Sequence, residues 1–199
     1  MKLSDYFGND IGSPQIRGSF SSLTGGVSIT AAGNDIWGNN DQGYFYSMVY
    51  EGDFEFVIRV ESFTRADLYS KAGIMARESL DPDSKHVFLL TFPDNDLRNN
   101  NNGGIEFAYR MQTGGASVAI YPPQCISTPP LFPASFPNVW LKLVRNQNEF
   151  QSFFCEDGKE WKPYSSLHID LKQIVHLGLV VTSHNESISS TANFSHLRW

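Results

Sequence analysis

The sequence predicts an all-β protein, a two-sheet antiparallel β-sandwich of the jelly-roll type. Short runs of alternating apolar and polar residues recur along the chain, and clusters of Gly, Pro, Asn and Asp separate them. The one helical pattern covers residues 170–175, which is about one turn. With 199 residues, of which 41% are hydrophobic, the chain is long enough to bury a full core. We therefore expect a single domain over residues 1–199.

The clearest predicted strand is "FEFVIRV", residues 54–60. Phe54 and Phe56 alternate with Glu55 and Arg59, so the apolar and polar side chains point to opposite faces. Similar runs predict further strands at residues 44–50, 72–78, 86–92, 104–111, 117–121, 139–146, 149–155, 176–183 and 193–199.

Two long connections interrupt the strand pattern, an asparagine-rich run at residues 95–104 and a proline-rich run at 121–137. They flank one predicted hairpin, so we expect both at one end or edge of the sandwich, where binding loops on β-scaffolds usually lie. The proline-rich run carries Phe132 and Phe136. Either these rings are exposed and meet a partner, or they pin the loop to the sandwich.

Three carboxylates at a spacing of two residues, Glu51, Asp53 and Glu55, suggest a glycosidase site, because alternate strand residues lie close enough for paired acid catalysis. Gly52 argues against it. Gly followed by Asp is a turn signal, so Glu51 and Asp53 are predicted to straddle a hairpin turn and only Glu55 to face outward. The phenylalanines of this strand face the opposite side, which leaves no aromatic cleft. We expect no catalytic residues and no enzyme activity.

The net charge of the chain bears on its partners, and the first residues bear on its cellular compartment. The formal net charge is −6 and the Lys and Arg residues are scattered, which argues against nucleic acid or an anionic membrane as a partner. The start "MKLSDYFGND" lacks the apolar run of a signal peptide, and no later run is long enough for a membrane span. The prediction is a cytoplasmic protein in which Cys125 and Cys155 are free thiols.

No metal or cofactor site is predicted. The five histidines do not fall at zinc-binding spacings, and "DNDLRNNNNGGIE" has Asn99 where an EF-hand loop requires glycine. His184 ends a predicted strand beside Asn185. It either meets a ligand there or caps a turn, and the second role is the commoner one.

Three larger side chains are predicted to be structural. Arg77, in the strand "KAGIMARES", is expected to be buried and paired with a carboxylate. Trp37 in "DIWG" is expected to fold inward, and Trp161 after the "EDG" turn to anchor a hairpin. For both tryptophans core packing is favoured over a sugar-binding platform.

The order of several motifs resembles one known domain family. It has unknown function and the concanavalin A-like lectin/glucanase jelly-roll fold, it is related to laminin-G-like modules, and its members include the fungal regulation-of-enolase proteins. The resemblance covers Asp35 to Phe194. The motifs that carry it are "DIWG" (35–38), "GDFEFVIRV" (52–60), "KAGIMARESLDPDSKH" (71–86), "GIEFAYR" (104–110), "VWLKLVR" (139–145), "DGKEW" (157–161), "GLVVTSHN" (178–185) and "ANF" (192–194).

The resemblance implies a non-catalytic, cytoplasmic fungal binding protein that regulates a glycolytic enzyme, enolase, through protein–protein contact. A carbohydrate-binding module is the alternative, since Tyr44, Tyr46 and Tyr69 are available to stack on sugars. A glycoside hydrolase ranks third. The candidate partner-binding residues are Phe132, Phe136, Tyr69 and His184.

Overall fold

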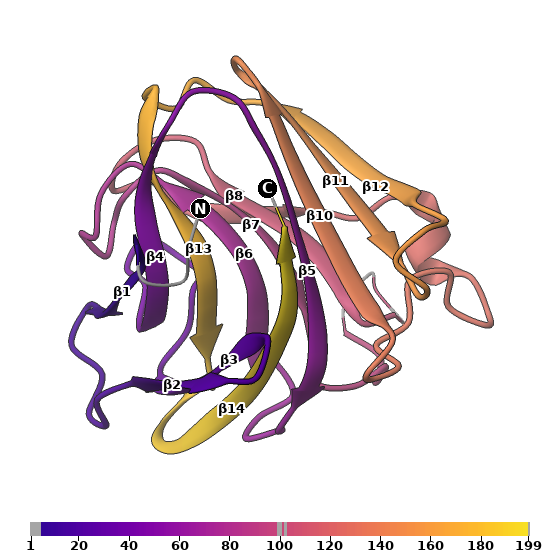
Figure 1. The fold of residues 1–199 in the computed structure, drawn as a ribbon, viewed down its shortest axis with the longest axis horizontal. Coiled ribbons are helices and arrows are strands. Elements are labelled where there is room, and N and C mark those ends of the chain that lie inside the picture. Colours follow the sequence, from indigo (N-terminus) through magenta and orange to yellow (C-terminus); the bar gives the residue numbers. More distant parts are fainter. Residues whose placement is uncertain (1–4, 99–100, 102, 199) are drawn as a thin grey trace.

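The structure, a computed structural model, describes residues 5–98, 101 and 103–198. Their strands pair antiparallel into two sheets of seven strands each, stacked as two layers (Figure 1). The fold is therefore the predicted two-sheet antiparallel β-sandwich.

Each sheet combines strands from distant parts of the chain. In spatial order, sheet A contains β1 (Phe7–Ile11), β4 (Gly43–Glu51), β13 (Ile174–Thr182), β6 (Lys71–Arg77), β7 (His86–Thr91), β8 (Ile105–Arg110) and β9 (Ser117–Ile120). Sheet B contains β12 (Lys162–His168), β11 (Glu149–Cys155), β10 (Val139–Asn146), β5 (Phe54–Phe63), β14 (Asn185–Arg198), β3 (Gly26–Gly33) and β2 (Ser19–Leu23).

The core between the sheets follows the predicted period of two. Phe54 and Phe56 of β5 point into it, whereas Glu55 is exposed on the outside. In β6, Ala72 and Ile74 face the same core. The alternation seen in sequence thus assigns β5 and β6 their inner faces.

Sheet A is also buried on its outer face, because loops cover it. A second apolar cluster lies there, to which Ile36 of the β3–β4 loop and Met75 of β6 belong. Every residue of β6 and β7 is buried as a result. Sheet B has only a small apolar cluster on its outside, around Trp140.

The turn at Gly52 exists, but the expectation of a hairpin was wrong. β4 belongs to sheet A and β5 to sheet B, so the turn carries the chain from one layer to the other. Gly52 has φ 92°, a conformation that favours glycine. The Asp53 carboxylate accepts a hydrogen bond from the backbone N–H of Gln147 at 2.6 Å. Glu51, Asp53 and Glu55 therefore form no common row.

The predicted helical turn at residues 170–175 was also wrong. β13 begins within it, and Ile169 and Leu171, spaced by two residues, are both buried in the core. Sequence patterns also missed β1, β2, β3 and β12. In β2 all five residues are exposed, so no alternation marks it. A 3₁₀ turn at Pro123–Ile126 lies in the proline-rich connection.

Both cysteines are free and buried, as predicted. The Cys125 thiol donates to the Tyr164 hydroxyl at 3.3 Å. Within the described part of the chain, no helix has the length and apolar character needed to cross a membrane.

The two long connections contact each other beside the β8–β9 hairpin. This agrees with the expectation that both lie at one end or edge of the sandwich. The Asn95 amide bridges both backbone groups of Ala134, at 2.6 and 3.1 Å. The N–H of Gly104 donates to the Phe132 carbonyl at 2.8 Å. Asn99, which entered the EF-hand comparison, lies outside the described residues.

Of the two roles considered for the loop phenylalanines, Phe132 pins the loop. It is 2% exposed, and its ring lies 4.8 Å from Tyr164 and 6.0 Å from Phe154, edge to face. Phe136 is half-buried against the same core. An exposed anchor at Phe132 is thereby excluded, because the ring fills space between the sheets.

A buried charge cluster confirms the expectation for Arg77. Asp41, from the β3–β4 loop, accepts a forked pair of hydrogen bonds from Arg110 at 2.6 and 2.8 Å, and Arg77 lies 3.3 Å from it. All three side chains are fully buried, and burial lowers the pKa of Arg77 to about 10. Burial and both guanidinium groups hold the pKa of the adjoining His86 well below its usual range, so this ring is neutral.

Replacing Phe132 by Ala is expected to destabilise the protein by about 3–5 kcal/mol, because it removes a fully packed aromatic ring. Urea denaturation measures the loss. Leu131→Ala, at the exposed neighbouring position, should change stability by less than about 0.5 kcal/mol. Equal small losses for both variants would show that the ring is a surface residue.

Replacing Asp41 by Ala is expected to cost about 3–5 kcal/mol, because Arg77 and Arg110 then remain buried without a counter-charge. Thermal or urea unfolding checks this. The exposed Glu55→Ala is the control and should be nearly neutral. A stable Asp41→Ala variant would contradict a central role for the cluster.

Candidate functional site

A pocket of about 200 Å³ opens on the outer face of sheet A, at the end where β6 begins. Sheet and loops both contribute to it. Its lining residues are Asp35 and Trp37 from the β3–β4 loop, Tyr69 from the β5–β6 loop, Lys71 of β6, Glu106 of β8, Tyr121 after β9 and His184 from the β13–β14 turn.

Two charged side chains from the sheet form the base of the pocket. Lys71 and Glu106 are each only 3% exposed, and their strand neighbours Ala72 and Ile105 point into the core. Lys71 forms an ion pair with Asp35. Both charges lie on the outer face because side chains alternate along a strand.

Glu106 is only half satisfied. Its Oε2 accepts a hydrogen bond from the Tyr121 hydroxyl, whereas its Oε1 is buried and has no hydrogen-bond partner in the structure. Burial raises the pKa of Glu106, although Lys71 and the Tyr121 hydroxyl oppose the shift. A buried polar atom without a partner is rare in a folded protein, so a group from a ligand is one way to satisfy it.

The β3–β4 loop places Trp37 over the pocket. The Asp35 carboxylate accepts a hydrogen bond from the backbone N–H of Ile36 at 2.7 Å. The Ile36 side chain is fully buried in the outer apolar cluster. The next side chain therefore turns the other way. Trp37 is 39% exposed, and the Lys71 ammonium lies 5.7 Å from its ring centre. The expectation that Trp37 folds into the core was wrong, because Ile36 takes the buried position instead.

Tyr69 and His184 form the opposite wall. Their ring centres are 5.4 Å apart. One ring nitrogen of His184 lies 3.1 Å from Asp67 and the other 3.5 Å from Asp35, so the imidazole bridges two loops. His184 has φ 55°, in the tight turn between β13 and β14. The Ser70 hydroxyl donates to the Ser183 carbonyl at 2.7 Å and holds that turn against the β5–β6 loop.

The structure brings together two of the four candidate residues. Tyr69 and His184 line the pocket, whereas Phe132 and Phe136 pack at the loop end of the core. Tyr44 and Tyr46, considered as sugar platforms, are only 7% and 4% exposed.

Sequence reasoning missed Asp35, Lys71, Glu106 and Tyr121. One signal was present for Glu106, a single carboxylate inside the apolar run "GIEFAY". A carboxylate in a strand that is buried on both faces requires a partner or a ligand.

The lining groups suit a small polyhydroxyl ligand. Asp35 and Glu106 offer acceptor oxygens, Lys71 offers donors, and the Trp37 and Tyr69 rings offer apolar faces. The volume is below the roughly 300–1,000 Å³ of pockets for drug-sized ligands, so it fits a single small unit. Within the described ranges, no group of three His, Cys, Asp or Glu side chains is arranged to hold a metal ion.

Comparisons with known proteins agree on the fold. No family model matches the sequence, and no curated protein matches it. Solved structures do match. A functionally unknown protein from Saccharomyces cerevisiae has a TM-score of 0.72 at 15% identity, with 100% of this chain and 97% of that chain covered.

Two further matches are a carbohydrate-binding module and a lectin. The carbohydrate-binding module CBM66 from Bacillus subtilis has a TM-score of 0.59 at 14% identity, covering 96% of this chain and 92% of that one. Lectin I-B4 from Griffonia simplicifolia has a TM-score of 0.50 at 7% identity, covering 96% and 93%. The chain therefore has the concanavalin A-like jelly-roll fold that its motifs implied.

The raised pKa of Glu106 predicts a pH-dependent stability. A carboxyl group whose folded pKa is raised contributes stability that is complete below its ordinary pKa, 4.5, and is lost as the pH rises through the folded value. The wild type should therefore lose stability relative to Glu106→Gln above about pH 4.5, by at most about 1.4 kcal/mol per pH unit. Urea denaturation of both proteins across this range measures the difference. A difference that does not change with pH would contradict the raised pKa of Glu106.

Proposed function

We propose that this protein is a non-catalytic carbohydrate-binding protein that holds one sugar unit of a glycan in the pocket between Trp37 and Tyr69. Lys71, Asp35 and Glu106 at its base hydrogen-bond the sugar hydroxyl groups. The rings of Trp37 and Tyr69 pack against the apolar faces of the sugar.

The observation that carries the proposal is the Oε1 atom of Glu106. It is buried, lacks a hydrogen-bond partner in the structure and belongs to a residue that lines an open pocket. A carboxyl oxygen of this kind gains most from a ligand hydroxyl, because leaving it unpaired costs about 1–3 kcal/mol. A purely apolar ligand leaves that cost in place.

Two further facts support a sugar. The pocket combines donors, acceptors and rings within about 200 Å³, which suits a compact polar ligand. Solved structures with this fold include a carbohydrate-binding module, CBM66. Identity to that module is only 14%, so its own ligand is not transferred.

Enolase regulation, which the sequence resemblance implies, stays a prediction that no observation tests. Its proposed contact residue Phe132 is buried, so a partner on that loop has to meet other side chains. The pocket, by contrast, is formed by residues that the structure places together. We therefore rank carbohydrate binding first.

The proposal predicts saturable binding to at least one glycan. A panel of soluble oligosaccharides, screened on an array and then titrated calorimetrically, identifies the ligand. Glu106→Gln should weaken binding about tenfold or more, since a hydrogen bond to a charged group contributes about 1.5–3 kcal/mol. Trp37→Ala should also weaken binding, because it removes one of the two rings that pack against the sugar.

Trp161→Ala is the matched control. Trp161 is a half-buried ring over the outer face of sheet B, where the Lys142 ammonium lies 4.7 Å from it, and its loss should leave glycan affinity unchanged. Absence of binding across the panel would overturn the proposal. Binding that survives both pocket variants would place the sugar elsewhere.

A further inference from the structure

The outer face of sheet B carries cationic side chains that lie on aromatic rings. Trp140 of β10 lies between two guanidinium groups, with Arg59 at 5.5 Å and Arg198 at 5.7 Å from its ring centre. The imidazole of His196 is tilted against the same indole at 4.9 Å. Trp140 is consequently only 7% exposed, and the charged groups form the surface above it.

Lys142 lies two residues after Trp140 on β10 and therefore on the same outer face, so it extends this surface along the strand. Its ammonium lies 4.6 Å from the Phe153 ring centre and 4.7 Å from that of Trp161. Lys142 of β10 pairs with Val57 of β5, and Val57 pairs on its other edge with Arg198 of β14. Lys142 and Arg198 therefore lie two strand spacings apart, about 10 Å.

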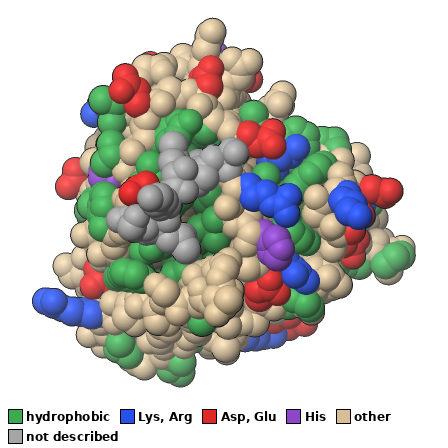
Figure 2. Space-filling model, viewed as in Figure 1, with side chains coloured by type: hydrophobic (Ala, Val, Ile, Leu, Met, Phe, Trp, Pro, Cys, Tyr) green, Lys and Arg blue, Asp and Glu red, His purple; other side chains and the backbone are tan. Residues whose placement is uncertain are grey.

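Among the described residues, two of these cations lie near no carboxylate. Most Lys and Arg side chains in the described ranges lie within ion-pair distance of a carboxylate, as Arg59 does with Glu61 at 3.3 Å. No such contact occurs for Lys142 or Arg198 among the described residues. Figure 2 shows blue side chains and one purple side chain gathered over the region where Figure 1 places β5, β10 and the C-terminus.

Lys142 and Arg198 lie on aromatic rings in a chain whose formal net charge is −6. Aromatic rings beneath Lys142 and Arg198 limit the positions that these long side chains adopt. A negatively charged ligand that binds here therefore loses less side-chain entropy than at freely moving lysines.

We propose that the outer face of β10, β5 and β14 is a docking surface for a short acidic segment of a partner protein. Carboxylates of the segment pair with Lys142 and Arg198. The Trp140 indole beneath holds the guanidinium groups in place, an Arg–Trp arrangement that is common at the energetic centres of protein interfaces.

The size of the face favours a segment over a folded domain. Three strands spaced about 4.8 Å apart, each showing about seven residues at 3.3 Å, give roughly 330 Å². Stable contacts between domains bury about 800 Å² per partner. An extended peptide fits the smaller area.

The charge count favours carboxylates over a polyanion. Proteins that hold nucleic acid by its backbone commonly neutralise about 6–10 phosphates, whereas this face has two unpaired Lys and Arg side chains among the described residues. The net charge of −6 repels a long polyanion. The indole of Trp140 is covered, so bases and sugars cannot stack on it.

This surface is independent of the pocket. Lys71 and Glu106 lie on the outside of sheet A, whereas Lys142 and Arg59 lie on the outside of sheet B. A glycan and an acidic segment can therefore bind at the same time. Failure of one proposal leaves the other intact.

A nuclear magnetic resonance titration tests the surface. The probe is a capped peptide of about seven residues that alternates Glu and Ser, which places its carboxylates on one side of an extended chain. We expect saturable shifts of the Trp140 and Trp161 indole N–H signals, with the Trp37 signal unmoved. Lys142→Gln combined with Arg198→Gln should weaken binding severalfold, up to about thirtyfold, because two ion pairs are lost.

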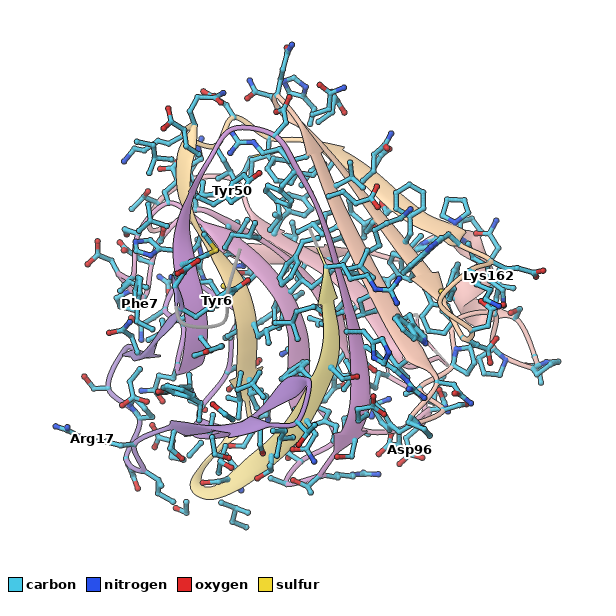
Figure 3. The ribbon with its side chains drawn as sticks, viewed as in Figure 1. Tyr6, Phe7, Arg17, Tyr50, Asp96 and Lys162 are labelled. Atoms are coloured by element: carbon cyan, nitrogen blue, oxygen red, sulfur yellow. The ribbon has the colours of Figure 1, made fainter. Side chains whose placement is uncertain are left out.

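The control removes the same charge elsewhere. Arg17 and Lys172 are exposed; Lys172 lies near Glu78 at the end of β6, and Figure 3 shows Arg17 projecting at the margin near β2. Arg17→Gln combined with Lys172→Gln should leave the affinity within about twofold. If the first double variant does not fold, the single change at exposed Arg198 gives the same comparison.

Three results would overturn the proposal: unmoved indole signals, equal weakening by the control variant, or equal binding of a peptide that alternates Gln and Ser. A short oligonucleotide that binds more tightly than the acidic peptide would also overturn it, by assigning the face to phosphates.

Discussion

The Asp41 carboxylate is the interaction on which the outer side of sheet A depends. It pairs with Arg110 of β8 and Arg77 of β6, and its own backbone N–H donates to the Pro82 carbonyl at 2.8 Å. One residue thus ties the β3–β4 loop to two strands and to the β6–β7 loop. Because buried charges are costly unless they are paired, this arrangement is strongly specified. It fixes the loop that carries Trp37 over the pocket.

The two sheets use their outer faces differently. Loops cover sheet A, and the uncovered end of β6 and β8 becomes a concave pocket with Lys71 and Glu106 at its base. Sheet B has no comparable cover, and Arg59 and Lys142 lie on aromatic rings there. A concave site suits one small polar unit, whereas a flat charged face suits an extended segment. One sandwich thereby offers two kinds of surface.

Prediction from sequence succeeded where a strand has one apolar and one polar face, as in β5, because alternation then identifies both the strand and its core side. It failed for β2, whose residues are all exposed, and at the Gly52 turn, where local chemistry marks a turn but not the sheet to which each strand belongs. For Phe132 the sequence left two roles open. Packing against Tyr164 decided between them.

His184 was recognisable as a candidate because it ends a predicted strand, and Tyr69 because a tyrosine ring can stack on a sugar. Their proximity to Glu106 was not, since strand order in the sheet determines it and the chain visits that sheet in several separate passes. Pairing between distant segments depends on the packing of the whole core, which no local pattern encodes.

By itself, the sequence determined the fold class, the inner face of most strands, the burial of Arg77 and the free state of both thiols. These properties follow from local alternation and composition. Only the tertiary structure decided that Trp37 overhangs a pocket, that one carboxylate oxygen of Glu106 lies beneath it without a hydrogen-bond partner among the described residues, and that cations from β5 and β14 gather around Trp140. The physical reason is that a site needs side chains on neighbouring strands, and neighbours in a sandwich are set by long-range pairing.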